Sequence, residues 1–185
     1  EKPHPLTRRL SQTYAQSVEE GIQMILSVDD EMAQRAAQTL AGERYAAFAD
    51  AVRKTLAEGG RVIFSGCGSS GRLSMRLEQS WRNAIAKLSD QYPQAKEALE
   101  EKLDHVGNIM TGGDYAVIRA VESFEDSTAL GEEQARLLGL QEGDLLVGVT
   151  ATGETTSILG TAMQALRDGA SVYMLICADH KPLIE

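Results

Sequence analysis

Hydrophobic residues follow two different spacings along the chain, and the spacing changes after Gly60. Before that point they recur every three or four residues, which is the spacing of one face of an α-helix. Ser11 is expected to cap a long helix that Gly42 interrupts, and a second helix is expected to end at Gly59-Gly60. We therefore predict an N-terminal helical segment over residues 1–60, which carries no catalytic signature and packs on the core or on another subunit.

Short, uniformly apolar runs alternate with amphipathic segments over the rest of the chain. The expected strands cover residues 62–64, 106–110, 145–149 and 172–177. The expected helices cover residues 72–88, 115–123, 128–138 and 155–167, with a further exposed helix inside residues 89–104. Strands that are apolar on both faces and alternate with helices indicate a parallel sheet covered on both sides. We predict an α/β fold over residues 61–185, a three-layer αβα sandwich with a doubly wound sheet.

Charge and composition argue against several classes of partner. The formal net charge of −9 argues against nucleic acid, because phosphate backbones bind to basic surfaces. No apolar run approaches the ~20 residues of a membrane helix, and the N-terminus lacks a secretory signal, so we expect a cytoplasmic protein without a membrane partner. The two cysteines, Cys67 and Cys177, lack metal-ligand spacing. We expect free, buried thiols and no metal site.

The segment Gly66–Gly71, Gly-Cys-Gly-Ser-Ser-Gly, lies between the first predicted strand and the next helix. Its glycines match the dinucleotide pattern G-x-G-x-x-G. That pattern also needs an acidic residue at the end of the following strand, about 20 residues on, and here residues 87–90 still belong to a helix or loop. Ser69 and Ser70 instead add hydroxyls to a helix N-terminus, which suits a compact terminal phosphate. A capped helix with a tight turn explains this loop equally well.

A second loop, Thr150–Ser157, also follows an apolar strand and opens a helix. It holds five hydroxyls in eight residues, more than one helix cap requires, although a threonine-rich cap is the simpler alternative. Loops that follow parallel strands lie at the same edge of the sheet, and ligands bind there where the strand order reverses. We therefore predict that the two loops flank one phosphate site.

Both loops together make the chain resemble the sugar isomerase (SIS) domain family. Gly66–Ser70 looks like the first motif of the family, and Thr150–Thr155 looks like its second, a hydroxyl-x-hydroxyl-Gly-Glu-Thr phosphate loop. The resemblance implies a small-molecule phosphosugar ligand and no cofactor. The substrate-binding residues that it implies are Gly68, Ser69, Ser70, Thr150, Thr152, Gly153, Glu154 and Thr155.

A closer resemblance extends from the N-terminal helices to Cys177. The segments that carry it look like those of the N-acetylmuramic acid 6-phosphate etherase and glucokinase regulatory protein families: Gly66–Leu73, Thr111–Ala116, Ala120–Glu122 and Glu125–Ser127. The family fold is a five-stranded parallel sheet of flavodoxin-like order between helices, commonly in a homodimer. Only four strands are readable here, so we expect the last strand and the elements after it to be missing.

Etherase chemistry, which the resemblance introduces, eliminates a lactyl ether and needs a proton acceptor and a proton donor, often two carboxylates. Glu125 falls at the place of the second family glutamate and is our candidate catalytic residue, the alternative being a surface acid at a helix end. Ser80 takes the place of the first glutamate, and Glu78 is about 200° around the helix axis from it. The pair is therefore incomplete. We expect a regulatory or diverged etherase-like protein that binds a phosphorylated sugar, with an active etherase as the alternative.

Two further functions stay open. Aldose–ketose isomerisation would use Glu154 as a base, with His180 as a helper, although a charged helix start and a surface histidine are simpler interpretations. A nucleotide-binding interaction module could be built on the same sheet. Thermal-shift screening separates these classes, because only the sugar-binding hypotheses predict stabilisation by hexose 6-phosphates.

Overall fold

The structure, a computed structural model, describes residues 4–177. These residues form two compact units, with the boundary between Asp50 and Ala51. Helix α3, Glu43–Ala57, crosses this boundary. The division into a helical segment over residues 1–60 and a domain over residues 61–185 stays a prediction.

The first unit is helical. It contains a 3-10 turn, η1 (Pro5–Thr7), and the helices α1 (Leu10–Gln16) and α2 (Val18–Leu40). Ser17 separates the two helices, because its backbone is extended (φ −150°, ψ 116°) and its side chain accepts a hydrogen bond from the Glu20 amide at 3.2 Å. A serine followed three residues later by a glutamate is a helix-start signature. The prediction of one long helix capped by Ser11 is therefore wrong.

The second unit is built on a parallel sheet. Its strands are β1 (Val62–Gly66), β2 (Val106–Met110), β3 (Leu145–Thr150) and β4 (Ser171–Ile176). They lie in the order β2-β1-β3-β4, and Val62 is opposite Val106 on one side and Leu145 on the other. Its longer helices are α4 (Gly68–Gln91), α7 (Thr128–Leu138) and α8 (Thr156–Arg167). The short helical pieces are η2 (Pro93–Ala95), α5 (Lys96–Glu100), η3 (Leu103–His105), α6 (Tyr115–Ile118) and η4 (Glu122–Phe124).

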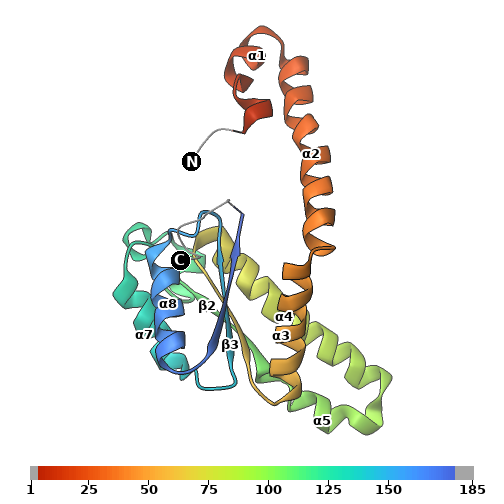
Figure 1. Ribbon diagram of the computed structural model, residues 1–185, viewed down its shortest axis with the longest axis vertical. Coiled ribbons are helices and arrows are strands. Elements are labelled where there is room, and N and C mark those ends of the chain that lie inside the picture. Colours follow the sequence, from red (N-terminus) through yellow and green to blue (C-terminus); the bar gives the residue numbers. More distant parts are fainter. Residues whose placement is uncertain (1–3, 178–185) are drawn as a thin grey trace. The chain divides into compact units, whose positions relative to one another are not determined.

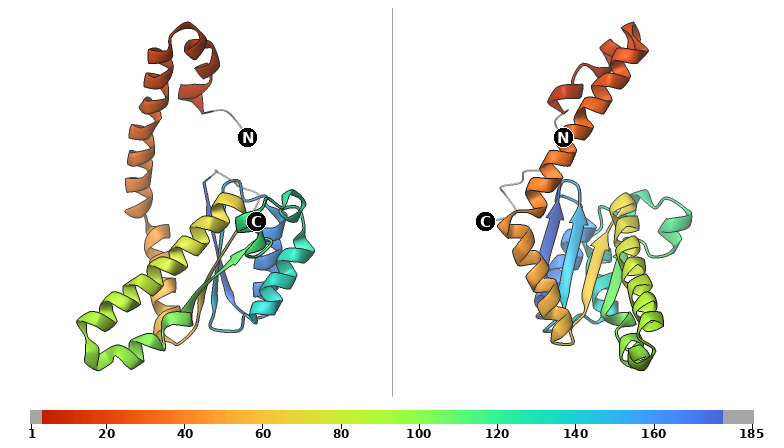
Figure 2. Two further views of the ribbon diagram at one scale, coloured as in Figure 1. Left: turned by 180° about the vertical axis from the view of Figure 1, so that it is seen from behind. Right: turned by 90° about the vertical axis from the view of Figure 1, so that its right-hand side faces the viewer.

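Helices cover both faces of this sheet (Figure 1 and Figure 2). The chain runs from β1 outward to β2 through α4, and then back past β1 to β3 and on to β4 through α7 and α8. Crossovers between parallel strands are right-handed, so the reversal of direction places α4 on one face and α8 on the other. Accordingly α4 packs on β1 and β2, whereas α8 packs mainly on β3 and β4 and against α7. The predicted three-layer, doubly wound α/β fold is confirmed.

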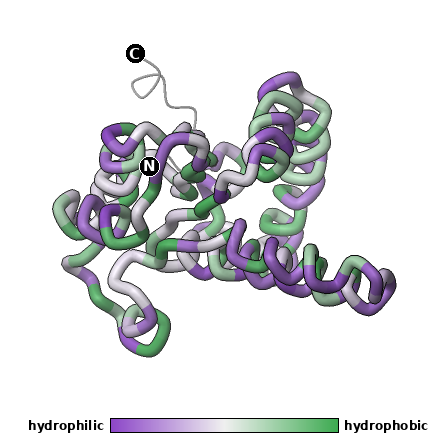
Figure 3. The backbone as a smooth tube through the Cα atoms, turned by 90° about the horizontal axis from the view of Figure 1, so that it is seen from below, coloured by the Kyte–Doolittle hydropathy of each residue, from purple (hydrophilic) through white to green (hydrophobic). Residues whose placement is uncertain are grey.

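Burial on both faces explains why the strands are uniformly apolar. Every residue of β3 is buried, because this strand has a neighbour on each side and helices above and below. The core cluster joins the strands to α7 and α8 and contains Ile63, Ile109, Ala135, Leu140, Leu146, Ala162, Ala165 and Ala170. Along the helices, hydrophobic and hydrophilic residues alternate (Figure 3), as expected where one face of each helix packs.

An ion pair between a buried carboxylate and a half-buried guanidinium stabilises the edge of the sheet at which the strands begin. Asp144, 2% exposed, accepts a hydrogen bond from the Arg61 amide at 2.8 Å and pairs with the Arg61 guanidinium at 2.6 Å. The same guanidinium donates to the carbonyls of Leu138 and Gly139 at the end of α7. The starts of β1 and β3 are thereby tied to α7, and the loops at the other ends of these strands extend from a fixed base.

Between β2 and α7 the chain is less helical than its sequence predicts. Helix α6 ends at Ile118, and Arg119 is extended, with φ −136° and ψ 140°. Only the 3-10 turn η4 follows before α7. The prediction of a helix over residues 115–123 is therefore wrong, and the extended part of this segment forms a wall of the site described next.

Candidate functional site

The two predicted loops leave the same edge of the sheet from neighbouring strands. β1 pairs with β3 in parallel, with Gly66 opposite Val149. Adjacent strands lie about 4.8 Å apart, so the loops begin within one strand spacing of each other. The strand order reverses at this pair, because β1 connects to β2 on one side and β3 connects to β4 on the other. This is the switch point at which α/β proteins bind ligands.

The backbone of the first loop is packed closely against the end of β1. A side chain at Gly66 would lie 2.5 Å from the backbone of Ser70, and one at Gly71 would lie 2.8 Å from the Gly66 carbonyl oxygen. Gly68 has a φ of +55°, a left-handed conformation that favours glycine. Helix α4 therefore starts immediately after this turn, and Ser69 and Ser70 lie in its first turn.

The N-terminus of α4 carries no side-chain cap. Its N-cap residue, Cys67, makes no capping hydrogen bond within the described part of the chain, whereas Ser17 caps α2 and Ser127 caps α7. First-turn amides have no partner inside a helix, and they form the positive end of its dipole. Ser69 is exposed and Ser70 is half-buried. This helix end can therefore accept an anion.

Hydroxyl groups fix the shape of the second loop. Thr150 is 3% exposed, and its hydroxyl oxygen lies 3.1 Å from that of Thr155 and accepts a hydrogen bond from the Gly153 amide at 3.3 Å. The Thr152 hydroxyl accepts one from the Glu154 amide at 3.2 Å. Thr152 and Thr155 are half-buried and Glu154 is exposed. The loop is thus preformed, with part of its hydroxyl set at the surface.

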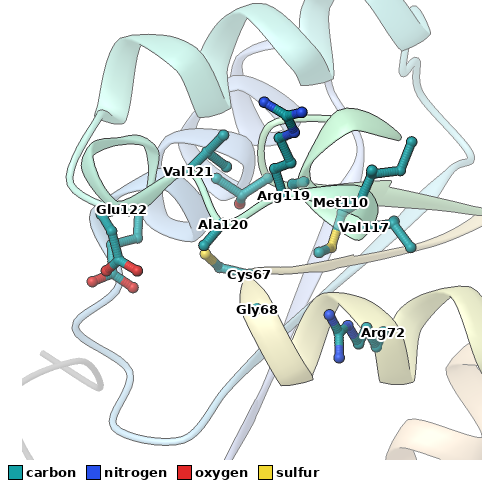
Figure 4. Close-up of a pocket in the computed structure, with 13 residues that line it drawn as sticks. Cys67, Gly68, Arg72, Met110, Val117, Arg119, Ala120, Val121 and Glu122 are labelled. Atoms are coloured by element: carbon teal, nitrogen blue, oxygen red, sulfur yellow. The ribbon is translucent and has the colours of Figure 1, made fainter.

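A hollow of about 210 Å³ lies beside the first loop (Figure 4). Its walls come from the start of α4, the end of β2 and the segment that follows β2. The residues with polar or charged side chains that line it are Cys67, Arg72, Thr111, Arg119, Glu122 and Glu125. Gly68 also lines it, whereas the other predicted ligand residues, Ser69, Ser70 and the second loop, are not among the described residues of its wall.

Charges are separated within the hollow. Figure 4 shows Glu122 at one end, with Arg72 and Arg119 on the other side of Cys67. Burial raises the pKa of the Cys67 thiol, a hydrogen bond with Thr111 opposes that rise, and the charge of Glu125 adds to it. Cys67 is therefore an uncharged thiol at neutral pH.

The cysteines are less buried than the sequence suggests. Both are free, but Cys67 is half-buried and Cys177 is exposed. The expectation that both thiols are buried is wrong, because Cys67 opens onto the hollow and Cys177 follows the edge strand β4.

Glu125 belongs to both parts of the site. Its side chain is exposed and lines the hollow. Its carbonyl oxygen accepts hydrogen bonds from the Ser157 amide at 3.0 Å and the Thr156 hydroxyl at 3.1 Å, at the start of α8. The segment after β2 therefore connects the hollow to the helix that the second loop opens.

Several lining residues were missed by the sequence analysis. Glu122 stands three residues before Glu125, a spacing that brings side chains together on a helical turn, so this signal was available. Arg72 directly follows the glycine motif, lies in the second turn of α4 and lines the hollow. Thr111 lies in a segment that carries the family resemblance but was not named as a site residue, and Arg119 gave no signal, because its position depends on how residues 111–125 fold.

The position of the first family glutamate lies away from the hollow. Helix α4 continues through Ser80, which is about 18 Å along the axis from Gly68 at ~1.5 Å per residue. Ser80 is exposed, and its hydroxyl donates to the Arg76 carbonyl at 2.8 Å. Glu78 is half-buried and binds Asn108 and Arg82. His180, the suggested helper in isomerisation, lies outside the described residues.

Neither a metal centre nor a membrane helix is found over residues 4–177. Those residues contain no group of three or more His, Cys, Asp or Glu arranged to hold a metal ion. No helix among them is long and apolar enough to cross a membrane.

Comparison with models of protein families identifies the family of the chain. The profile of the glucokinase regulatory protein N-terminal SIS domain matches residues 46–166. The chain belongs to the SIS domain family. The matched region contains the first loop, the hollow and the second loop.

Curated relatives of this SIS domain are etherases. The N-acetylmuramic acid 6-phosphate etherase of Aliivibrio fischeri (strain MJ11) is 35% identical over 136 residues, which cover 74% of this chain and 41% of the relative. N-acetylmuramic acid 6-phosphate etherase 1 of Vibrio cholerae is 31% identical over 162 residues, which cover 88% of this chain and 49% of the relative. The chain spans about half the length of the curated relatives it matches.

Solved structures of SIS isomerases share the fold. Phosphoheptose isomerase from Neisseria gonorrhoeae aligns with a TM-score of 0.62 and 17% identity, over 91% of this chain and 79% of that one. A phosphoheptose isomerase from Francisella tularensis aligns with a TM-score of 0.59 and 24% identity, over 84% and 74%. At these identities the likeness concerns the fold alone.

Proposed function

We propose that this SIS domain binds a phosphorylated sugar, with the phosphate between the two loops and the sugar extending into the hollow. The observation that carries the proposal is the pairing of β1 with β3, each followed by a hydroxyl-containing loop and the start of a helix. The start of α4 offers first-turn amides to an anion, the second loop offers hydroxyls, and both helix starts add the positive ends of their dipoles. This local field suits a phosphate even in a chain with a net charge of −9.

The loop hydroxyls have different roles in this proposal. Ser69 and Ser70, in the uncapped first turn of α4, donate to the phosphate together with amides of that turn. Thr152 and Thr155 donate from the second loop, and Thr150 shapes that loop, because its buried hydroxyl already bonds inside it. Gly68, Gly153 and Glu154 supply backbone at the two turns. The sugar then faces Glu125 in the hollow.

The relatives suggest which ligands to test first. Proteins named for N-acetylmuramic acid 6-phosphate are 31–35% identical to the chain, so an amino-sugar 6-phosphate is the proposed class. We propose a regulatory or diverged etherase-like role for the binding, and a homodimer as the assembly. Sedimentation of the full chain tests the homodimer directly.

Isothermal titration calorimetry with the full chain tests the binding. Saturable binding is expected for N-acetylmuramic acid 6-phosphate or fructose 6-phosphate, and none for N-acetylmuramic acid or NAD. Ser69→Ala and Thr152→Val should each weaken binding by about 10- to 100-fold, because each removes a charge-assisted hydrogen bond worth ~1.5–3 kcal/mol. Ser80→Ala, on the outer face of the same helix, is the matched control and should bind normally. Equal affinity for the sugar with and without its phosphate would contradict the proposal.

An active etherase is the second candidate, and the hollow itself supports it. Glu122 and Glu125 both line the hollow, so two carboxylates are available although Ser80 is remote. One could remove a proton beside the carbonyl and the other could protonate the leaving oxygen. Release of lactate from N-acetylmuramic acid 6-phosphate, abolished by Glu125→Gln, would establish this activity. Tight binding without lactate release would leave the regulatory role.

A further inference from the structure

Thr111 lies at a junction of the site. It follows β2, is 2% exposed, and donates its backbone amide to the Gly66 carbonyl of the first loop at 3.0 Å. Its hydroxyl oxygen lies 3.1 Å from the hydroxyl of Ser157, which is fully buried in the first turn of α8. Its side chain also hydrogen-bonds to the thiol of Cys67. One side chain therefore touches the start of both loop-bearing helices.

Ser157 extends this junction to Glu125. Its amide donates to the Glu125 carbonyl at 3.0 Å, and the neighbouring Thr156 hydroxyl donates to the same oxygen at 3.1 Å. A continuous set of hydrogen bonds thus runs from Cys67 through Thr111 and Ser157 to the backbone of Glu125. The set connects the first loop, the start of α8 and the acid that faces the hollow.

The elements around the junction are packed too closely to shift independently. A side chain at Gly131 of α7 would overlap the Ser157 carbonyl, and one at Gly160 of α8 would overlap the Thr128 carbonyl. The side-chain Nε2 of Gln134, on α7, donates to the Met110 carbonyl at 2.7 Å, next to Thr111. Helix α7 therefore contacts both α8 and the end of β2, and the Thr111–Ser157 hydrogen bond joins these two elements directly.

We propose that Thr111 is a positioning residue, which aligns the two phosphate loops and Glu125 through its buried hydrogen bond with Ser157. The proposal rests on the proposed phosphosugar function, because alignment matters only if one ligand contacts both loops. Both hydroxyls are buried, and the positioning role requires neither of them to contact the ligand. Removing one leaves the other buried without its partner, and the start of α8 then loses its direct tie to the first loop.

The Cys67 thiol reports on Thr111 independently of any ligand. The hydrogen bond between Thr111 and Cys67 opposes the rise of the thiol pKa. Between Thr111 and Ser157, either hydroxyl can be the donor. A change at Thr111 should therefore reach the thiol directly.

The binding arm of the test uses calorimetry with N-acetylmuramic acid 6-phosphate. Thr111→Val and Ser157→Ala should each raise Kd by about tenfold, which corresponds to ~1.4 kcal/mol. The double variant should bind like either single variant, because both remove the same bond. Thr111→Ser keeps the hydroxyl and should restore binding. Thr161→Val is the matched control, because it breaks another buried hydroxyl pair, Ser65–Thr161 at 3.0 Å, within the same unit.

The thiol arm needs no ligand and uses a Cys177→Ser background, which leaves Cys67 as the single thiol. The rate of Cys67 alkylation is measured against pH. The charged residues around this thiol are Glu125, Asp126, Glu122, Arg72 and Arg119, and they are the same in every variant. Thr111→Val should move the midpoint to higher pH, because it removes the hydrogen bond that opposes the rise of the thiol pKa, and Thr111→Ser should not.

The two arms separate the outcomes. Weaker binding by Thr111→Val and Ser157→Ala, with normal binding by Thr161→Val, supports the positioning role. If Thr111→Val and Thr161→Val lose stability alike and bind alike, Thr111 is merely a packed residue and the proposal is overturned. If the unmodified chain binds no phosphosugar, the proposed function fails, and the thiol arm then decides: an unchanged midpoint in Thr111→Val overturns the hydrogen bond between Thr111 and Cys67. Should Thr111→Val not fold, Ser157→Ala is judged by the binding criteria.

Discussion

Gly66→Ala is the substitution that most directly disturbs the first loop. A Cβ atom at residue 66 would lie 2.5 Å from the carbonyl carbon and oxygen of Ser70 and 2.6 Å from the amide nitrogen of Gly71. Carbon atoms pack best at about 3.5–4.0 Å, and all three neighbours are backbone, so no rotamer change relieves the overlap. The first turn of α4 must move outward by about 1 Å.

This displacement should reduce both stability and binding. Forcing extra atoms into a packed site costs about 1–3 kcal/mol, and at ~2–4 °C per kcal/mol the melting temperature should fall by roughly 2–12 °C. Phosphosugar affinity should fall as well, because the α4 amides no longer face the second loop. Differential scanning calorimetry and titration calorimetry measure the two effects.

Gly68→Ala serves as the control for the steric argument. Its Cβ would meet open space, and only the left-handed φ of +55° opposes alanine there, at about 1–2 kcal/mol. In Gly68→Ala, helix α4 should keep its position. This variant should therefore lose stability, but its affinity for the phosphosugar should fall less than that of Gly66→Ala. If Gly66→Ala melts and binds like the unmodified chain, the tight contact between β1 and α4 is refuted.

Three further predictions concern other parts of the chain. Asp144→Ala should destabilise the protein by about 1.5–3 kcal/mol in urea denaturation, because it removes a buried carboxylate that accepts hydrogen bonds from the Arg61 amide and guanidinium, whereas Glu133→Gln on the surface should leave the midpoint unchanged. Ser127→Ala removes the cap of α7 and should cost about 1 kcal/mol by the same method. Glu125→Gln should lower the pKa of the Cys67 thiol, since the Glu125 charge helps to raise it. Alkylation in the single-thiol background should then reach half its maximal rate at lower pH, and an unchanged profile would mean that Glu125 does not face Cys67.

Much of the fold could be predicted from the hydrophobic pattern alone. The four strands and the helices α7 and α8 lie close to their predicted positions, because uniformly apolar runs between amphipathic segments leave a covered parallel sheet as the natural arrangement. The helix starts were harder. Ser11 and Ser17 are both good capping residues, and only the glutamate at position 20 distinguishes Ser17 as the start of α2.

The candidate site likewise has a part that could be predicted from the sequence and a part that could not. The two loops could be located, because glycines and hydroxyls after apolar strands are local signals, and the sheet order then places the strands side by side. The hollow could not be located. It depends on the extended backbone at Arg119, where a helix was expected, and on contacts such as Thr111 with Ser157, which are far apart in the sequence. Tertiary contacts of this kind produce no periodic pattern in the sequence.

The shared phosphate site is tested most directly by following backbone amides in nitrogen-15 NMR spectra while N-acetylmuramic acid 6-phosphate is added. The amides of Ser69 and Ser70 in the first loop and of Thr152 and Gly153 in the second should shift together and give one common Kd. The same sugar without its phosphate should leave them in place. Shifts confined to one loop, or equal shifts with the unphosphorylated sugar, would contradict a phosphate held between the loops that follow β1 and β3.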